Sequence, residues 1–392
     1  MKQLRLYAPL LFSAALVVAL AVVIIWKKPG SAGASSAVRN EGANPIRIGI
    51  VLPLTGDGAN YGKRCLNGIS WAVDKINRSG GITGRKLVTV VEDSRSTPKD
   101  AVTAISKLIS ADHIKIVVGD IMSGPTLAMA PIAEQNKVVL LAPGASNPSL
   151  RDAGDFIFRD WTSDDYDGKA MADYLLKVNQ KTVGLLVQKI DYAVGVADAL
   201  AREFNALGGK VIQREEFETT ETNLRTYLAK LKTAGVPNVY LSAQSQETGM
   251  ALKQAIEIGY RPRWFTTLTV DTPECARIAG KARESVIFTT PAFDLSAQTP
   301  VMTSFVDGFK ERFGQDPEAA AGHGYDAINI LTRVISSVGT DPTDVKNELY
   351  KVRDFPGVTG NMSFDDHGDV LKPISIKQIK QGQPVLLEVF SK

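Results

Sequence analysis

One glycine-rich stretch has residue types that could bind a phosphate group. Gly56, Gly58 and Gly62 follow an apolar run in "GIVLPLTGDGANYG", just before a predicted helix. In a dinucleotide-binding loop the glycines let the backbone approach a pyrophosphate, and an acid about 20 residues later binds the ribose. Here the third glycine comes late, and Glu92 and Asp93 stand about 34 residues after Gly58. We therefore expect no cofactor. The loop is either a surface turn with positive-φ glycines or the rim of a cleft at a strand's carboxyl end.

The residues that could support catalysis or metal binding are scattered. His113, His323 and His367 show no spacing of a nucleophile with a base, so we expect a protein that is not an enzyme. Cys65 and Cys275 fall in what we predict to be different lobes, and we expect them to be free and buried rather than bridged. No metal-binding spacing is present in the sequence.

Length and charge restrict the possible classes of protein. The chain has 392 residues with 44% hydrophobic and 22% charged residues, which is enough for two globular domains with their own cores. The net charge is only +3, from 45 basic and 42 acidic residues, and no basic stripe with interleaved aromatics occurs. We therefore expect no nucleic-acid partner.

The N-terminus is predicted to meet a membrane. A charge-free apolar run from Leu6 to Trp26 follows Lys2 and Arg5. About 20 apolar residues can span a bilayer, so residues 1–28 are interpreted as a signal-anchor or, alternatively, a long cleaved signal peptide. Basic residues before the run favour a cytoplasmic N-terminus and a main body in the periplasm or on the extracytoplasmic face. In the signal-anchor interpretation the N-terminal helix attaches this body to the inner membrane. The Gly/Ser/Ala-rich residues 29–45 indicate a flexible tether.

From residue 46 onward, strands alternate with helices. The alternation predicts parallel, doubly wound α/β sheets, and because it restarts after residue 180 we expect two lobes. The strand-like runs are 46–54, 86–93, 114–120 and 138–144, then 182–188, 210–217, 238–244 and 263–270. Helices are expected between them and near 300–313, 320–338 and 343–351, and a hairpin is expected at the C-terminus, with its turn at "KQGQP". A tail that completes one lobe after the chain has visited the other implies more than one crossing between lobes.

The chain resembles the periplasmic solute-binding proteins of ABC transporters of the Leu/Ile/Val-binding type. The resemblance begins at "IRIGIVLPLTGDGANYGKRCLNGISWAVDKINRSGGITGRK" and continues in order through "VVGDIMSGPTLAMAPIAEQNKVVLLAPGASNPSL", "DYAVGVADAL", "GHGYDAINIL" and "VTGNMSFDDHGD". It implies two α/β lobes joined by a hinge of three crossings, the type 1 periplasmic-binding fold. The implied lobes comprise 46–163 plus about 289–361, and 164–288 plus about 362–392.

The resemblance also implies a site for a small amino acid or related carboxylate. The family's carboxylate site corresponds to Ser123 and Ser146, with backbone groups near Gly144 and Ala145, where hydroxyls and amides can hold a carboxylate without a cation. Ser123 could instead be a helix N-cap and Ser146 a turn residue. Tyr192 corresponds to the family's cleft tyrosine, or is only a tyrosine at the start of a helix. Tyr61 is expected on the rim of the first lobe.

At two positions the chain departs from the members that bind branched-chain amino acids. Gln244 stands where they carry a tyrosine, and Thr269 stands where they carry the glutamate that pairs with the ligand ammonium. Asp271, two residues later, could supply that carboxylate or could cap the following helix. The cysteine pair that some members carry in this part of the first lobe is missing, and Ser96 and Met122 stand near those positions. Leucine-like specificity is therefore not implied.

The function implied is capture of the ligand between the lobes and delivery to an ABC permease in the membrane, by a monomeric protein. The alternative is a membrane-anchored sensory domain of the same fold that hands a closure signal to a partner protein.

Overall fold

The computed structural model describes residues 44–391. The predicted signal segment and nearly all of the tether lie outside the described residues, so the expected membrane anchor is not among them. Within 44–391 no helix has the length and apolar character required to cross a bilayer.

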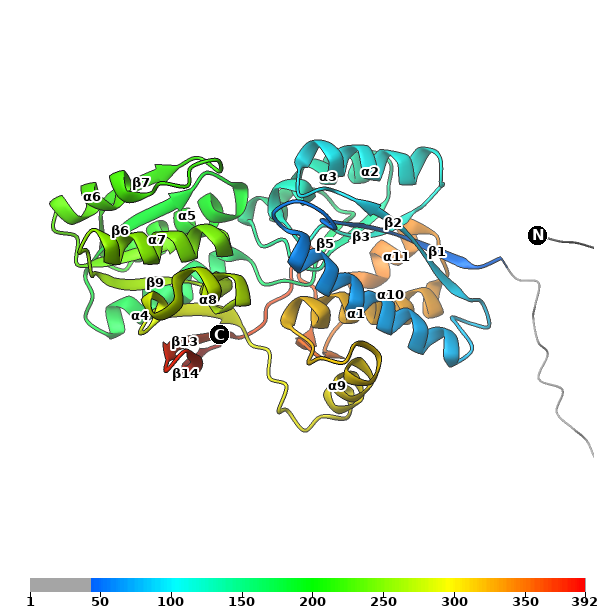
Figure 1. Ribbon diagram of the computed structural model, residues 1–392. Helices are drawn as coiled ribbons and strands as arrows, with labels where there is room; N and C mark the ends of the chain where they lie inside the picture. Colours follow the sequence, from blue (N-terminus) through cyan, green and yellow to red (C-terminus); the bar gives the residue numbers. More distant parts are fainter. Residues whose placement is uncertain (1–43, 392) are drawn as a thin grey trace, which may run out of the picture. The chain divides into compact units, whose positions relative to one another are not determined.

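The first sheet has five parallel strands in the order β2-β1-β3-β4-β5 (Figure 1). Its strands are β1 (Ile46–Leu52), β2 (Leu87–Asp93), β3 (Ile116–Gly119), β4 (Val139–Ala142) and β5 (Ile157–Arg159), and the helices that connect the first four are α1 (Ala59–Arg78), α2 (Pro98–Ser110) and α3 (Ser123–Gln135). Alternate strand residues face opposite ways: Ile116 and Val118 join one hydrophobic cluster, whereas Val117 joins another with residues of α2 and α3. Both faces are covered, which explains the continuous apolar runs in the sequence.

The second sheet has seven strands in the order β14-β13-β10-β9-β8-β6-β7. They are β6 (Thr182–Gln188), β7 (Lys210–Phe217), β8 (Asn238–Ser242), β9 (Arg263–Thr267), β10 (Ile287–Pro291), β13 (Ile374–Lys380) and β14 (Gln383–Phe390), with helices α4 (Asp164–Lys177), α5 (Asp191–Ala206), α6 (Arg225–Thr233), α7 (Ser245–Glu257) and α8 (Pro273–Ala279). The predicted C-terminal hairpin is confirmed, since β13 and β14 pair antiparallel. The predicted lobe boundary at 289 falls within β10, which pairs with β9 and β13.

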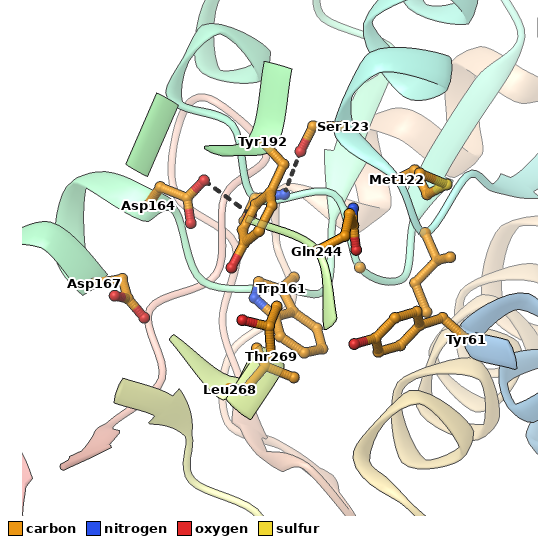
Figure 2. A pocket seen from close by; sticks show the side chains of 13 residues that line it. Tyr61, Met122, Ser123, Trp161, Asp164, Asp167, Tyr192, Gln244, Leu268 and Thr269 are labelled. Carbon is orange, nitrogen blue, oxygen red and sulfur yellow. Dashed lines mark hydrogen bonds between the residues drawn. The ribbon is translucent and has the colours of Figure 1, made fainter. Parts of the chain in front are cut away.

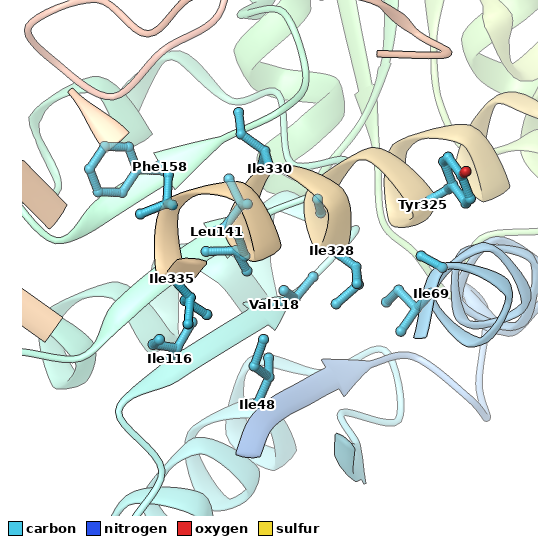
Figure 3. Packing of buried hydrophobic residues seen from close by; sticks show 14 of the residues in the cluster. Ile48, Ile69, Ile116, Val118, Leu141, Phe158, Tyr325, Ile328, Ile330 and Ile335 are labelled. Atoms are coloured by element: carbon cyan, nitrogen blue, oxygen red, sulfur yellow. The ribbon is translucent and has the colours of Figure 1, made fainter. Parts of the chain in front are cut away.

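The chain passes between the two sheets three times within the described residues. It crosses after β5, returns after β10, and crosses again before β13. Between the second and third crossings it forms α9 (Pro300–Phe313), α10 (Ala319–Val338), α11 (Pro342–Leu349), β11 (Phe355–Gly357) and β12 (Gly360–Met362). Ile328 and Ile335 of α10 pack in one cluster with Ile48 of β1 and Ile69 of α1, so the first sheet is covered by a helix from the last third of the chain (Figure 3).

The glycine-rich loop between β1 and α1 is held by hydrogen bonds to Asp93 at the end of β2 and to Ser96 just after it. Asp93 accepts hydrogen bonds from the amides of Leu54 and Thr55 and from the Thr55 hydroxyl. Although burial opposes it, this hydrogen bonding keeps the pKa of Asp93 below its usual value. The acid that could have bound a ribose is therefore occupied by the loop itself. Of the three glycines only Gly56 has positive φ, at 79°.

Gly62 has a different role from Gly56, because it lies inside α1 and is surrounded closely. A Cβ atom at this position would lie 2.0 Å from the carbonyl oxygen of Pro53. Only a residue without a side chain lets α1 approach the end of β1 so closely. The loop is thus a turn shaped by close packing, and Tyr61, beside Gly62, lines a cavity.

Candidate functional site

A cavity lies between the two sheets, lined by residues that follow the carboxyl ends of their strands (Figure 2). Its volume is about 80 Å³. The lining residues are Tyr61, Ile121, Met122, Ser123, Gly144, Ser146 and Trp161, followed by Asp164, Asp167, Tyr192, Gln244, Leu268 and Thr269. Both sheets contribute residues to this cavity. The carboxyl ends of the strands are the usual place for a ligand in open α/β sheets.

Ser123 and Ser146 meet at the start of α3. The Ser123 hydroxyl accepts hydrogen bonds from the amides of Ser146 at 3.3 Å and Asn147 at 3.2 Å. Ser123 is not the N-cap, because Met122 holds that position and supplies no capping side chain. The N-terminus of α3 therefore opens towards the cavity without a side-chain cap, an arrangement suited to an anion. Gly144 also lines the cavity, whereas the buried Ala145 does not.

Two carboxylates missed in the sequence, Asp164 and Asp167, line the same cavity (Figure 2). Both lie in the first turn of α4, whose N-cap is Ser163. Asp164 is 3% exposed and accepts a hydrogen bond of 3.0 Å from the Ser146 hydroxyl. Burial, with repulsion from Asp167, raises the pKa of Asp164 well above its usual value. Burial likewise raises the pKa of Asp167 to about 6, against the hydrogen bond from Thr289.

The two predicted tyrosines lie on opposite sides of the cavity (Figure 2). Tyr192, in the first turn of α5, donates its hydroxyl to the Thr267 hydroxyl at 2.6 Å, and burial raises its pKa well above the usual value. The Tyr61 hydroxyl lies 2.6 Å from the Ser245 hydroxyl at the start of α7. This second contact joins a helix of the first sheet to a helix of the second.

Gln244 and Thr269 reach the cavity from the ends of β8 and β9. Gln244 is the N-cap residue of α7, and its backbone N–H donates a hydrogen bond to the side-chain oxygen of Gln188. The Thr269 hydroxyl lies 3.1 Å from that of Thr248 and 3.4 Å from that of Thr267. The Thr269 hydroxyl on this wall is therefore positioned by two buried hydroxyls behind it.

The structure does not bring Asp271 to the cavity. The strand predicted over 263–270 ends at Thr267, and residues Leu268–Asp271 form a 3-10 helix that directs Asp271 elsewhere. Its carboxylate lies 3.8 Å from the Arg283 guanidinium. It is also not the cap of α8, because Thr272 fills that position and accepts from the amide of Cys275. Of the candidate residues, Asp271 and Ala145 are the two that do not line the cavity.

Trp161 extends the site towards the crossings between the sheets. Its ring lies 4.5 Å from the ring of His323, which is buried in α10. The Nδ1 atom of His323 lies 3.1 Å from Asp160, and Asp160 also pairs with the buried Lys372 of the third crossing. Lys372 and His323 hold the pKa of Asp160 below its usual value although its burial acts in the opposite direction. His323 thus belongs to a buried ion-pair network.

The two cysteines are buried and free. Cys65 lies in α1 and Cys275 in α8, on elements that pack on different sheets.

Comparison with known proteins agrees with this geometry. A family model described as "Periplasmic binding protein" matches residues 45–384. A leucine-, isoleucine-, valine-, threonine- and alanine-binding protein of Pseudomonas aeruginosa is 30% identical over 332 residues, covering 84% of this chain and 88% of that protein. A Leu/Ile/Val-binding protein homolog of Brucella abortus is 30% identical over 333 residues, with the same coverage.

Two solved structures are similar along nearly their whole length. The leucine-binding protein LivK of Thermotoga maritima has a TM-score of 0.82 at 29% identity, covering 88% of this chain and 98% of that one. LivJ of Streptococcus pneumoniae, solved with isoleucine, has a TM-score of 0.81 at 25% identity, covering 88% and 99%. The chain therefore belongs to the periplasmic binding protein family, with the type 1 fold of two mostly parallel α/β sheets.

Proposed function

We propose that this protein captures a small amino acid in the cavity between its two sheets and delivers it to an ABC permease. The observation that carries this proposal is a cavity lined both by the uncapped N-terminus of α3 and by buried carboxylates of α4. An α-amino acid carries a carboxylate and an ammonium on one carbon, so it matches both. The names of the relatives, which include leucine-, isoleucine- and valine-binding proteins, support the same ligand class.

The ligand carboxylate is assigned to the side formed by Ser123, Gly144 and Ser146. The amides at the start of α3 and the hydroxyl of Ser123 can donate hydrogen bonds to a carboxylate there. No side chain at Gly144 obstructs the approach of a ligand to the backbone. Charge-assisted hydrogen bonds of this kind hold an anion without a lysine or arginine.

The ligand ammonium is assigned to Asp164. This carboxylate is buried and lines the cavity, and its Oδ2 is held by the Ser146 hydroxyl on the carboxylate side of the site. The family's glutamate is replaced here by Thr269, which is neutral. An acid from the first turn of α4 therefore takes over the role that the sequence had suggested for Asp271.

Capture is proposed to occur by movement of two lobes about the three crossings. We assign 46–163 with about 292–370 to one lobe and 164–291 with about 371–391 to the other, since β10 pairs in the second sheet through Pro291 and Val370 still packs in the cluster of the first sheet. The contact between Tyr61 and Ser245 spans the two lobes beside the cavity. A ligand that touches both lobes stabilises the arrangement in which these hydroxyls meet, in proportion to its greater affinity for that arrangement.

The location follows from the family, whose members act outside the cytoplasm. We further propose that the apolar run Leu6–Trp26 anchors the protein in the membrane. We also propose that the protein acts as a monomer. Mass spectrometry of the N-terminus of the purified protein would detect removal of this segment.

A ligand screen tests the proposed function. The full-length chain in a mild detergent is heated with each member of a panel of amino acids, amides and aromatic acids. Ligand at 100 times its dissociation constant adds about 2.7 kcal/mol, which raises the melting temperature of a domain of roughly 350 residues by about 4 °C. If no amino acid changes the melting temperature, the proposal is wrong.

A further inference from the structure

The cavity is lined by acidic side chains and by no basic one. Among the residues that line it, the charged side chains are Asp164 and Asp167, and no lysine, arginine or histidine is present. Arg159 lies behind Asp164, but both edges of its guanidinium are occupied: it binds both oxygens of Asp369 and the carbonyls of Ser146 and Asn147. The two aspartates therefore face the ligand without a cation from the described chain.

An amino acid with a neutral side chain does not balance this charge. Its carboxylate and ammonium cancel each other, so it adds no net positive charge to a cavity lined by two acids. With the ammonium at Asp164, Asp167 would be left as a buried carboxylate without a cation. Burying an ionised group without a partner is strongly unfavourable, so the site as built favours a ligand that brings a further positive charge.

Asp167 has room for such a partner. Its Oδ1 accepts a 2.6 Å hydrogen bond from the Thr289 hydroxyl, and no other side-chain partner is found for it among residues 44–391. The Asp167 residue is 7% exposed. Its side chain lines the cavity, as Figure 2 shows. Nearby, the hydroxyl of Tyr240 in β8 is fully buried and has no hydrogen-bond partner in the described chain. Burial, and then the charge of Asp167, raise the pKa of Tyr240 well above its usual value. Among the described residues, Asp167 thus has no cation as partner, and the Tyr240 hydroxyl near it has no hydrogen-bond partner.

A neighbouring hollow carries the same sign of charge. It shares Tyr61 and Gln244 with the cavity and is lined by Asp57, Glu247 and Glu274, again without a basic residue. The whole chain is slightly basic, at +3, so this acidic hollow is a local feature. A cleft lined by one sign of charge raises the local concentration of ligands of the opposite sign.

We propose that the ligand is an α-amino acid whose side chain carries a second cationic group, with the α-ammonium at Asp164 and the second cation at Asp167. This inference rests on the proposed function, because it places the ligand in the same cavity. Asp164 and Asp167 are three residues apart in one helical turn, a spacing that places their Cβ atoms about 5–6 Å apart. A short diamino acid has two ammonium groups separated by a comparable distance.

Matched pairs of ligands test this inference in the unmodified full-length chain. Isothermal titration calorimetry in detergent compares L-ornithine with L-norvaline and L-lysine with L-norleucine, which differ by the terminal ammonium group. We expect at least one basic amino acid to bind tenfold or more tightly than its neutral counterpart. If the neutral counterparts bind as tightly, the inference is wrong and the proposed function stands. If neither class binds, the proposed function fails as well.

A variant pair assigns the preference to Asp167. Asp167→Asn should abolish the preference, weakening the basic ligand at least tenfold while the neutral ligand keeps its affinity or gains. Asp165→Asn is the matched control, because Asp165 lies two residues away on the same helix, pairs with Arg202 and does not line the cavity. It should change neither affinity. A preference that survives in Asp167→Asn would overturn the assignment, and a thermal melt of each ligand-free variant verifies that it is folded.

Discussion

Replacing Asp167 with asparagine should make the ligand-free protein more stable at pH 8. Burial raises the pKa of this carboxyl to about 6, whereas an unfolded aspartate titrates near about 3.9. The folded state therefore binds the proton more tightly than the unfolded state. Stability contributed by the protonated group is fully present below about pH 3.9 and is lost as the pH rises through about 6. Asparagine is neutral at every pH and keeps a carbonyl oxygen for the Thr289 hydroxyl, so it avoids that loss.

The size of the gain follows from the difference in pKa. About 2 pKa units at about 1.4 kcal/mol each give about 3 kcal/mol at pH 8, falling below about 1 kcal/mol at pH 4. For a domain of roughly 350 residues this is about 4 °C in melting temperature. The other groups around Asp167 do not reverse the sign. The repulsion between Asp164 and Asp167 is relieved when Asp167 loses its charge, and the Thr289 and Tyr240 hydroxyls are neutral.

The assay is urea unfolding followed by tryptophan fluorescence at pH 8 and pH 4, with Asp165→Asn as the control. The control residue has a side chain 41% exposed, so its substitution should change the free energy of unfolding by less than about 1 kcal/mol at either pH. The reasoning is refuted if Asp167→Asn is no more stable than the unmodified chain at pH 8. An equal gain at both pH values would also refute it, since the effect would then not come from the charge.

Three further substitutions test other parts of the site and fold. Tyr61→Phe removes the hydroxyl that meets Ser245 across the cavity and should weaken ligand binding about five- to tenfold by calorimetry, about 1 kcal/mol; unchanged affinity would mean that this contact does not contribute to capture. Asp271→Asn should leave the affinities for lysine and norleucine within about twofold, and a selective loss for either would show that Asp271 reaches the ligand. Gly62→Ala should destabilise the protein by about 3 kcal/mol in urea unfolding, because its Cβ would meet the Pro53 carbonyl; wild-type stability would show that α1 shifts at little cost.

Much of the fold is predictable because its physical cause is local. Strands buried on both faces need continuous apolar runs, and such runs stand out between helices, as in 46–52 and 182–188. The C-terminal hairpin is visible because Gly382 supplies a residue suited to a tight turn between two strand-like runs. The spacing of the glycine-rich loop argues against a dinucleotide cofactor, and in the structure Asp93 accepts hydrogen bonds from the loop itself.

The charges of the site are less predictable because they depend on where elements meet. Acids in the first turn of a helix usually need no explanation beyond the helix dipole, so "SDDYDG" gives no sign that Asp164 and Asp167 face a cavity. Only the first crossing, which directs the start of α4 towards the other sheet, gives them that role. Asp271 shows the converse problem, since a single turn of 3-10 helix after β9 is enough to direct a plausible ligand residue towards Arg283.

The packing of α10 against α1 and β1 also determines when the protein can fold. Ile48 and Ile69 find their partners Ile328 and Ile335 more than 250 residues later in the chain, after five of the seven strands of the second sheet have been made. Contacts so distant in sequence form slowly, and until they do α1 is the only helix of the first three that packs on this face of the first sheet. The cluster on the other face uses residues between Val51 and Ile157 alone. A chain emerging from the ribosome can therefore complete one face of its first sheet early, and the other only after α10 has been made in the last third of its synthesis.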